Sequence, residues 1–360
     1  MAIQLSHLPS FPVPIKNGVG GLLGRRLYAG LGSAGTRFFY LDVDQQPLCW
    51  KPAPSFPGVA RNDTVCASNG REMYIFSGAG KLNPEDPLTV LMDGYVFSLE
   101  TESWQKIDTS LPVGLLGASA DFVDEKHLLF FGGYCKEVFD RLFAELANCK
   151  GATEQQRTLE AFMSQSIDRY GWNQDIWQFD IANPSWHIYS DNPNGATCGA
   201  SLVKHKQLFV LIEGEIKPGL RSLKTTGYHF LEGQKLSTQA LPRIVDHYDG
   251  HEGIAGGYSG LINNTITLVG GAYFIGSQSN FAQGRNYSHQ GLTKHYSESI
   301  WQLDSDDGWK EAGKMPEGCA YGVSIMVDDN LIVIGGELAS GCASDRCLAI
   351  SDTSRESSVC

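Results

Sequence analysis

Short apolar runs bounded by glycine, proline, asparagine and aspartate recur along the whole chain. Six of these runs end in a doublet that is wholly or partly glycine. They are LYAGLG (at Gly30 to Gly32), MYIFSGAG (at Ser77 and Gly78), LLFFGGY (at Gly132 and Gly133), LFVLIEGE (at Glu213 and Gly214), ITLVGGAY (at Gly270 and Gly271) and LIVIGGEL (at Gly335 and Gly336). Runs of this length and composition predict β-strands, and their recurrence predicts a repeat architecture.

A tryptophan recurs at a similar position relative to the doublets. Four of the units carry it after a strand, at Trp50, Trp104, Trp186 and Trp309, and the fourth unit, YHFLEGQKLST, lacks it. Glycine lets neighbouring backbones approach closely near a central channel, and an outer-strand tryptophan packs between adjacent blades. The pattern therefore predicts an all-β fold: one six-bladed kelch-type β-propeller over residues 1–360, with the doublets on inner strands.

One stretch has helical rather than strand periodicity. In residues 136–171, apolar side chains recur at helical spacing, first at Val138, Leu142, Phe143 and Leu146, and then at Leu159, Phe162 and Met163. This predicts two short amphipathic helices inserted in the third blade, with helices only there. The insertion is either a packing decoration or a lid over the channel mouth. The ring closes either with an N-terminal strand or with the C-terminal SSVC.

Composition and charge narrow the class of protein. With 360 residues, of which 42% are hydrophobic and 19% charged, the chain can bury a large core. The net charge of −12 and the absence of a basic run favour neither a nucleic acid nor an anionic membrane as partner.

Compartment is predicted from the cysteines and the start of the chain. Nine cysteines without a CxxC pair indicate reduced thiols rather than a disulfide framework or a structural zinc. No apolar stretch is long enough for a membrane span, and the start MAIQLSHLPSFPVP does not read as a signal peptide. We expect a cytoplasmic protein, or a periplasmic one if an N-terminal signal has been removed.

Polar segments follow several of the apolar strands. Because propeller ligands bind where inner strands and loops converge at one end of the channel, these segments are the candidate site. They contribute Arg37, Arg61, Asp63, Glu215, Arg221, Arg285, Asn286, Tyr287, His289, Lys294 and Tyr321. Guanidinium groups suit a carboxylate, amides and phenols suit hydroxyls, and a glutamate moves protons. The set predicts a small anionic polyhydroxy ligand.

Several motifs resemble one known family. The segments GLGSAGT, GEIKPGLR, AGGYSG, GRNYSHQGLTKHYS and AYGVS are similar to those of the bacterial N-acetylneuraminate epimerases, the sialic acid mutarotases. The resemblance implies a six-bladed kelch propeller that interconverts the α and β anomers of free N-acetylneuraminate. It places the proton-accepting glutamate on Glu215, with Arg221 as its partner. The chain departs from the family in lacking a signal peptide and in carrying an extra acid, Glu213, which rivals Glu215 as the base.

The remaining roles follow from that chemistry, which needs no metal and no redox cofactor. Arg221 is expected to hold the substrate carboxylate. The residues expected to bind the substrate are Arg61, Asn286, Tyr287, His289, Lys294 and Tyr321. The general acid stays open among a tyrosine, His289, Lys294 and water. Arg61 is equally well read as a blade-linking salt bridge, and Glu213 is read as structural.

Three other functions fit a propeller of this size. The main alternative is a kelch-type scaffold that binds protein partners without catalysis, although the candidate loops are polar rather than apolar. A sialidase would need an Asp-box, and SDDGW at 305–309 lacks the threonine of that motif. A copper radical oxidase would need a Tyr, His and Cys ligand cluster, which the sequence does not show.

Overall fold

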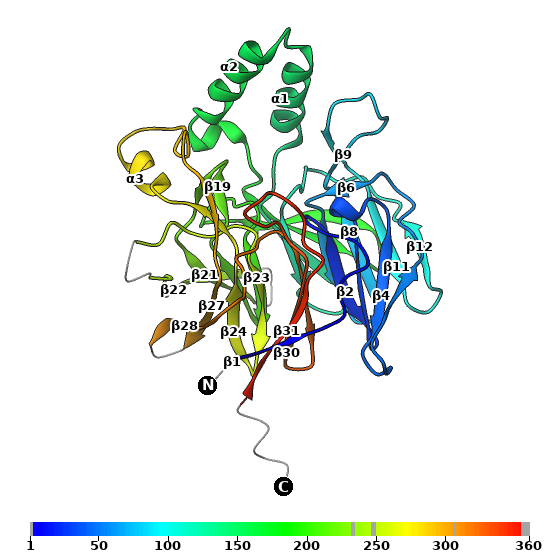
Figure 1. Ribbon diagram of the computed structural model, residues 1–360. Coiled ribbons are helices and arrows are strands. Elements are labelled where there is room, and N and C mark those ends of the chain that lie inside the picture. The colour runs from blue at the N-terminus through cyan, green and yellow to red at the C-terminus, as the bar shows by residue number, and fades with distance from the viewer. Residues whose placement is uncertain (1–2, 232–234, 246–249, 305–306, 354–360) are drawn as a thin grey trace.

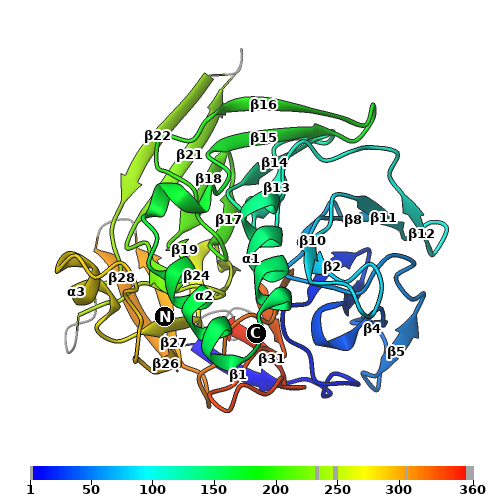
Figure 2. The ribbon, with the colours of Figure 1, turned by 90° about the horizontal axis from the view of Figure 1, so that it is seen from above.

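Six four-stranded antiparallel sheets are arranged around a common axis (Figure 1, Figure 2). The computed structural model describes residues 3–231, 235–245, 250–304 and 307–353. The prediction of a six-bladed all-β propeller is confirmed.

The first three blades follow each other directly along the chain. Blade 1 contains β2 (Val19–Leu23), β3 (Arg26–Gly30), β4 (Phe38–Asp42) and β5 (Trp50–Ala53). Blade 2 contains β7 (Val65–Ser68), β8 (Glu72–Phe76), β11 (Gly94–Ser98) and β12 (Ser103–Lys106). Blade 3 contains β13 (Ser119–Phe122), β14 (His127–Phe131), β15 (Asp175–Asp180) and β16 (Ser185–Asp191).

The last three blades complete the ring. Blade 4 contains β17 (Ser201–His205), β18 (Leu208–Ile212), β21 (Thr225–Leu231) and β22 (Lys235–Leu241). Blade 5 contains β23 (Tyr258–Ile262), β24 (Thr265–Val269), β27 (Ser299–Asp304) and β28 (Gly308–Lys314). Blade 6 contains β29 (Val323–Val327), β30 (Asn330–Ile334), β31 (Cys347–Asp352) and β1 (Ile3–His7).

The ring is closed by the N-terminal strand. β1 pairs antiparallel with β31, so that Leu5 lies opposite Ile350. Ile3 and Leu5 pack against the apolar cluster that contains Ile350. Of the two closure alternatives, the N-terminal strand is the one observed, and the C-terminal SSVC lies outside the described residues.

The doublets follow inner strands, as predicted, but not the innermost strands. They follow the second strand of each blade, whereas the innermost strands are β2, β7, β13, β17, β23 and β29. Both residues of every doublet have a positive φ, and in blade 1 these residues are Leu31 and Gly32. The doublet is therefore a left-handed turn that leads the chain out of the second strand, a conformation that glycine adopts at least cost.

The outer-strand tryptophans join neighbouring blades, as predicted. Their indole N–H groups donate across blade boundaries, for example from Trp50 to the carbonyl of Pro9 at 2.9 Å and from Trp309 to that of Pro242 at 3.0 Å. Trp186 of blade 3 packs against Phe76 of blade 2, with ring centroids 5.3 Å apart. These contacts fix the spacing of the blades and so the geometry of the channel end.

Two helices are inserted between β14 and β15, as predicted. They are α1 (Lys136–Asn148) and α2 (Ala152–Met163), and they project over the end of the ring opposite β1 and the end of β31 (Figure 1). Leu142 and Phe162 pack against Tyr170 and Trp172 in a small core of their own. No helix of the described ranges is long and apolar enough to cross a membrane.

The prediction that helices occur only between 136 and 171 is wrong. A third helix, α3 (Ser277–Ala282), follows blade 5's doublet, and a single 3-10 turn covers Gly32–Ala34. The start of α3 is capped from a distant segment, because the Glu252 carboxylate accepts the backbone N–H groups of Gly276 and Gln278 at 2.7 and 2.9 Å. A cap supplied by the tertiary structure leaves no local sequence signal.

Candidate active site

The residue after each doublet occupies an equivalent position in every blade. These residues are Ser33, Ala79, Tyr134, Glu215, Ala272 and Glu337. The backbone N–H of Glu215 bonds to the carbonyl of Cys198 at 2.8 Å, and that of Glu337 bonds to Ala320 at 2.6 Å. The repeat therefore places two carboxylates at the same end of the ring, on blades 4 and 6.

Glu215 lies on a two-stranded hairpin beyond blade 4. In this hairpin β19 (Glu215–Lys217) pairs with β20 (Leu220–Arg221), and Glu215 lies opposite Arg221. Glu215 Oε1 lies 3.2 Å from Arg221 Nη2 and accepts the backbone N–H of Gly219 at 3.3 Å. Gly219 has φ +78° and lies so close to the His289 ring that a Cβ atom would overlap it. The Pro-Gly turn thus sets both the ion pair and the packing of His289.

The Arg221 guanidinium is buried, with a side chain only 1% exposed. Its Nε donates to the carbonyl of Ala272 at 3.1 Å, its Nη2 donates to Tyr321 Oη at 3.4 Å, and the group stacks 4.8 Å from the Phe274 ring. Nη1 is buried and has no hydrogen-bond partner in the described part of the chain. An unpaired buried cationic donor is costly, so Nη1 is a candidate contact for an anionic ligand.

Glu337 is the centre of a second charged cluster. Its carboxylate accepts from Lys16 Nζ at 2.6 Å, from Tyr296 Oη at 2.5 Å and from Lys294 Nζ. Burial acts to raise the pKa of Glu337, but these three donors outweigh it and lower the pKa to about 2. Lys294, expected to bind substrate, is therefore also a partner of Glu337.

Sequence reasoning missed Lys16, Tyr296 and Glu337. The signal for Glu337 was present, since it follows the sixth doublet as Glu215 follows the fourth. Tyr296 lies on β26 (Lys294–Tyr296), which pairs with β25 (Ala272–Phe274). Its contact with Glu337 joins segments far apart in the sequence, which no local pattern predicts.

Six backbone hydrogen bonds form a closed ring around the axis at this end. Each N–H donates to the carbonyl of the equivalent residue in the preceding blade, at 2.7–3.3 Å. The ring residues all have a φ between 50° and 68° and are Asn17, Asp63, Gly117, Gly199, Gly256 and Tyr321. The Tyr321 ring occupies the space beside Gly256, where a Cβ would lie within 2.2 Å of it. The hydrogen-bonded ring fixes the backbone positions of its three non-glycine residues, Asn17, Asp63 and Tyr321.

The loop between α3 and β26 brings three predicted residues beside the hairpin. The His289 ring lies 4.9 Å from Phe274 and 4.9 Å from Tyr287, and its Nδ1 is buried without a partner among the described residues. Burial, with Arg221 and Lys217 next, lowers the pKa of His289 to about 4, so the imidazole is neutral at pH 7. Asn286 is exposed, and its carbonyl accepts Lys217 Nζ at 2.6 Å.

Arg61 is buried and makes its polar contacts within the protein. Its side chain is 0% exposed, and its guanidinium pairs with Asp93, with Nη1 at 2.6 Å from Oδ1 and Nη2 at 3.3 Å from Oδ2. It also donates to the carbonyls of Val59 and Ser77. These contacts match the salt-bridge alternative raised for Arg61.

Glu213 is held by two donors. Its Oε1 contacts His251 Nε2 at 2.6 Å, and its Oε2 accepts the backbone N–H of Ile254 at 2.6 Å. The residue is 2% exposed, and burial raises the pKa of its carboxyl. These contacts favour the structural interpretation over a role as the base.

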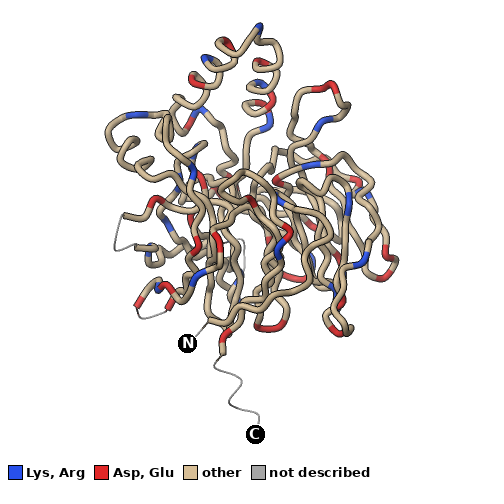
Figure 3. The backbone as a smooth tube through the Cα atoms, in the orientation of Figure 1, with Lys and Arg blue, Asp and Glu red and all other residues tan. Residues whose placement is uncertain are grey.

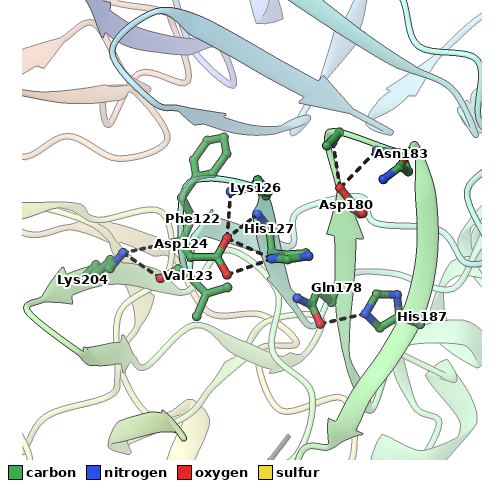
Figure 4. A network of polar contacts seen from close by, with 11 residues as sticks. Phe122, Val123, Asp124, Lys126, His127, Gln178, Asp180, Asn183, His187 and Lys204 are labelled. Atoms are coloured by element: carbon green, nitrogen blue, oxygen red, sulfur yellow. Dashed lines mark hydrogen bonds and ion pairs between the residues drawn. The ribbon is translucent and has the colours of Figure 1, made fainter. Parts of the chain in front are cut away.

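The opposite end of blade 3 carries a different polar network (Figure 4). Asp124 accepts from His127 Nδ1 at 2.8 Å and from the backbone N–H groups of Lys126 and His127. His187 Nε2 pairs with Gln178 Oε1 at 2.8 Å. The side chains satisfy one another around a strand turn, which indicates a structural network.

Charges of both signs are interspersed along the chain in Figure 3. The net charge of −12 repels an anion at long range, so attraction has to come from nearby cations. Arg221, Lys16 and Lys294 supply them at the doublet end.

Fold and site together define a β-propeller with two carboxylates and a buried guanidinium at the doublet end of its channel. The sequence model of the N-acetylneuraminate epimerase family matches residues 8–355, and the chain belongs to this family.

Two relatives and a solved structure are similar to this chain over nearly its whole length. A Vibrio cholerae protein named kelch domain-containing protein is 42% identical, over 97% of this chain and 99% of its own. An N-acetylneuraminate epimerase of Vibrio vulnificus is 36% identical, over 96% and 91%. The solved structure of YjhT superposes with a TM-score of 0.90 at 32% identity, covering 97% of this chain and 98% of that one.

Proposed function

We propose that this protein is an N-acetylneuraminate epimerase, which interconverts the α and β anomers of free sialic acid. Family membership and the names of the relatives support this activity. The observation that carries it is the Glu215–Arg221 pair at the doublet end, a carboxylate 3.2 Å from a buried guanidinium.

The reaction needs only proton transfers and a bond rotation. A base removes the proton of the anomeric hydroxyl while an acid protonates the ring oxygen, and the ring opens to the keto acid. Rotation followed by reclosure on the other face gives the other anomer. Among the described residues Glu215 Oε2 makes no hydrogen bond, so this oxygen is free to act as the base.

Arg221 holds the substrate carboxylate in this proposal. Three of its polar contacts are fixed by Ala272, Tyr321 and Glu215, which leaves Nη1 as the unused donor. A charge-assisted hydrogen bond from Nη1 would satisfy that donor and place the anomeric carbon beside Glu215.

The surrounding residues bind the rest of the sugar. Tyr287, His289 and Asn286 on the α3–β26 loop face the hydroxyl and acetamido groups. Tyr321 and Lys294 bind the sugar from the side nearer the axis of the propeller. Arg61, paired with Asp93, contributes by holding the segment that leads into blade 2.

Proton NMR of freshly released sugar tests this activity. A sialidase releases the α anomer from an α-sialoside, and the β anomer then appears slowly by itself. The protein should accelerate that appearance in proportion to its concentration. Unchanged kinetics would leave the protein-binding scaffold as the better interpretation.

We further propose that the protein works in the cytoplasm, where thiols stay reduced. The eight cysteines in the described ranges are free thiols, and Cys360 lies outside those ranges. Thiol titration of the denatured, non-reduced protein should find nearly all nine cysteines free. Several disulfides in protein isolated from its native cells would overturn this assignment.

A further inference from the structure

Asp63 is the only carboxyl on the closed hydrogen-bonded ring. Of the six ring residues three are glycine, and the others are Asn17, Asp63 and Tyr321. Asp63 donates its backbone N–H to Asn17 and accepts from Gly117, so its backbone position is fixed from both sides. Its side chain therefore starts at the axis, at the end of the ring that carries Glu215.

The Asp63 carboxyl has no structural partner in the described ranges. Glu337 is held by three donors, Glu213 by two, and Glu215 by Arg221 and Gly219. Asp63 makes no side-chain hydrogen bond to a described residue, and it is exposed to solvent. A residue with φ +50° that stabilises nothing through its side chain is a candidate for function.

The charged groups around Asp63 come from four other segments. The negative charges are Glu215 on β19 and Glu337 beyond β30. The positive charges are Lys16 before β2 and Lys294 on β26. Both lysines are held by Glu337, so neither neutralises Asp63 through a direct contact.

We propose that Asp63 donates the proton to the ring oxygen when sialic acid opens, opposite Glu215 as the acceptor. This inference rests on the proposed epimerase activity. Glu215 takes the proton of the anomeric hydroxyl, the bond between the anomeric carbon and the ring oxygen breaks, and its electron pair goes to the ring oxygen. That oxygen takes the Asp63 proton. The products are the open keto acid, a protonated Glu215 and an ionised Asp63, and reclosure reverses each transfer.

The protonation state of Asp63 suits this role. Desolvation by the neighbouring protein, followed by the charges of Glu215 and Glu337, raises the pKa of this solvent-accessible carboxyl to about 7. Both forms are therefore present at neutral pH, as a group that gives and regains a proton requires.

The other candidate acids are less suitable. His289 is neutral because burial lowers its pKa to about 4. Lys294 is engaged by Glu337, and burial raises the pKa of the Tyr321 phenol above its ordinary value. Asp63, with a pKa of about 7, can both give and regain a proton at neutral pH.

Asp63→Asn tests the inference, because asparagine tolerates the left-handed backbone but cannot donate this proton as an acid. Mutarotation of N-acetylneuraminate is measured by NMR between pH 5.5 and 8.5, with the spontaneous rate subtracted. The wild-type rate should fall on the alkaline side as Asp63 ionises. Asp63→Asn should lower the rate about 10²- to 10⁴-fold and remove that alkaline fall.

Two controls separate chemistry from geometry. Asn17→Gly alters a neighbouring ring position without a titrating group and should keep the alkaline fall. Asp124→Asn removes a carboxylate at the far end of blade 3 and should leave the rate unchanged. If Asp63→Asn fails to fold, Asp63→Gly replaces it, since glycine suits the positive φ.

The outcomes distinguish this inference from the function on which it rests. If the wild type is active and Asp63→Asn has the same rate and the same pH profile, the role of Asp63 is wrong. The proposed epimerase activity would still stand. A folded wild type that does not accelerate mutarotation at any pH would overturn the proposed function itself.

Discussion

Two glutamates two positions apart, Glu213 and Glu215, have opposite environments in this protein. Glu213 belongs to the doublet turn and is tied to His251 and Ile254, whereas Glu215 keeps one oxygen without a hydrogen bond to any described residue. Their separation follows from the doublet, because Glu213 and Gly214 both have a positive φ and interrupt the strand between Ile212 and Glu215. The contacts therefore favour a structural role for Glu213 and leave Glu215 as the candidate base.

Arg221→Lys should weaken substrate binding without unfolding the protein. Lysine keeps the charge but loses the planar fork that reaches Ala272, Tyr321 and the ligand carboxylate. We expect the loss of one charge-assisted hydrogen bond, about 1–3 kcal/mol, seen as a raised KM in the NMR assay. An unchanged KM with intact stability would mean that the carboxylate binds elsewhere, with Lys16 and Lys294 as the nearest alternative.

Asp63→Asn should also change stability in a pH-dependent way. The folded-state pKa of Asp63 is raised to about 7 from an ordinary 3.8, so the folded protein retains this proton between these values while the unfolded chain loses it. Stability of the wild type should therefore fall as pH rises from about 4 to 7. The variant should melt at a higher temperature than the wild type at pH 8, and this difference should shrink toward pH 4. A constant difference across the range would contradict the raised pKa.

At the scale of elements, the helical insertion is tied to the site by Lys217. This buried lysine donates to the carbonyls of Gln165, just after α2, and Asn286, at 2.5 and 2.6 Å. Burial lowers the pKa of its ammonium to about 8. One side chain thus connects the hairpin of Glu215, the helices above the ring and the loop of His289, which favours the lid interpretation over a pure packing role.

Lys217→Met should loosen both attached segments. Methionine has similar length but no donors, so two hydrogen bonds to a charged group are lost, each worth about 1.5–3 kcal/mol. Hydrogen exchange should accelerate around residues 164–170 and 285–290, with little change in the strands of blade 4. Lys204→Met, which removes a similar lysine-to-carbonyl bond at the far side of the blade, serves as the control. Equal hydrogen exchange around residues 164–170 and 285–290 in the two variants would argue against Lys217 as the connection between these segments.

The elements were predictable to different degrees. Strands, doublets and the two inserted helices repeat or alternate locally, so the sequence predicts them. The helix α3 could not be found, since Glu252 caps it from outside, and the position of the doublets on the second strand depends on sheet order rather than on pattern. The site divides in the same way: Glu215 and Arg221 share one hairpin, but the contacts of Glu337 with Lys16 and Tyr296 exist only in the folded ring.

At the scale of the whole molecule, one strand closes the ring. β1 supplies the outer strand of blade 6, and its apolar face adds Ile3 and Leu5 to the core that blades 5 and 6 share. The closed circle of backbone hydrogen bonds is completed between Asn17 and Tyr321, where the first and last blades meet. The geometry of the site therefore depends on closure.

Deleting residues 1–7 should open this junction. β31 loses its partner and becomes an edge strand, and two apolar side chains lose their packing, at a cost of about 2–4 kcal/mol in the free energy of unfolding. Denaturant unfolding measures the loss. Gln4→Ala, on the exposed face of β1, should leave stability within about 0.5 kcal/mol of the wild type. A deletion without effect would show that closure does not depend on β1.

The most direct measurement compares mutarotation of N-acetylneuraminate by the wild type, Glu215→Gln and Glu213→Gln. Glutamine keeps the shape of each side chain but cannot take the anomeric proton, so Glu215→Gln should slow the reaction about 10²- to 10⁴-fold while the protein stays folded. Glu213→Gln should lose stability through its contacts with His251 and Ile254 and keep most of its rate. A Glu215→Gln variant that is folded and as fast as the wild type would contradict the account, and loss of activity in Glu213→Gln alone would move the base to Glu213.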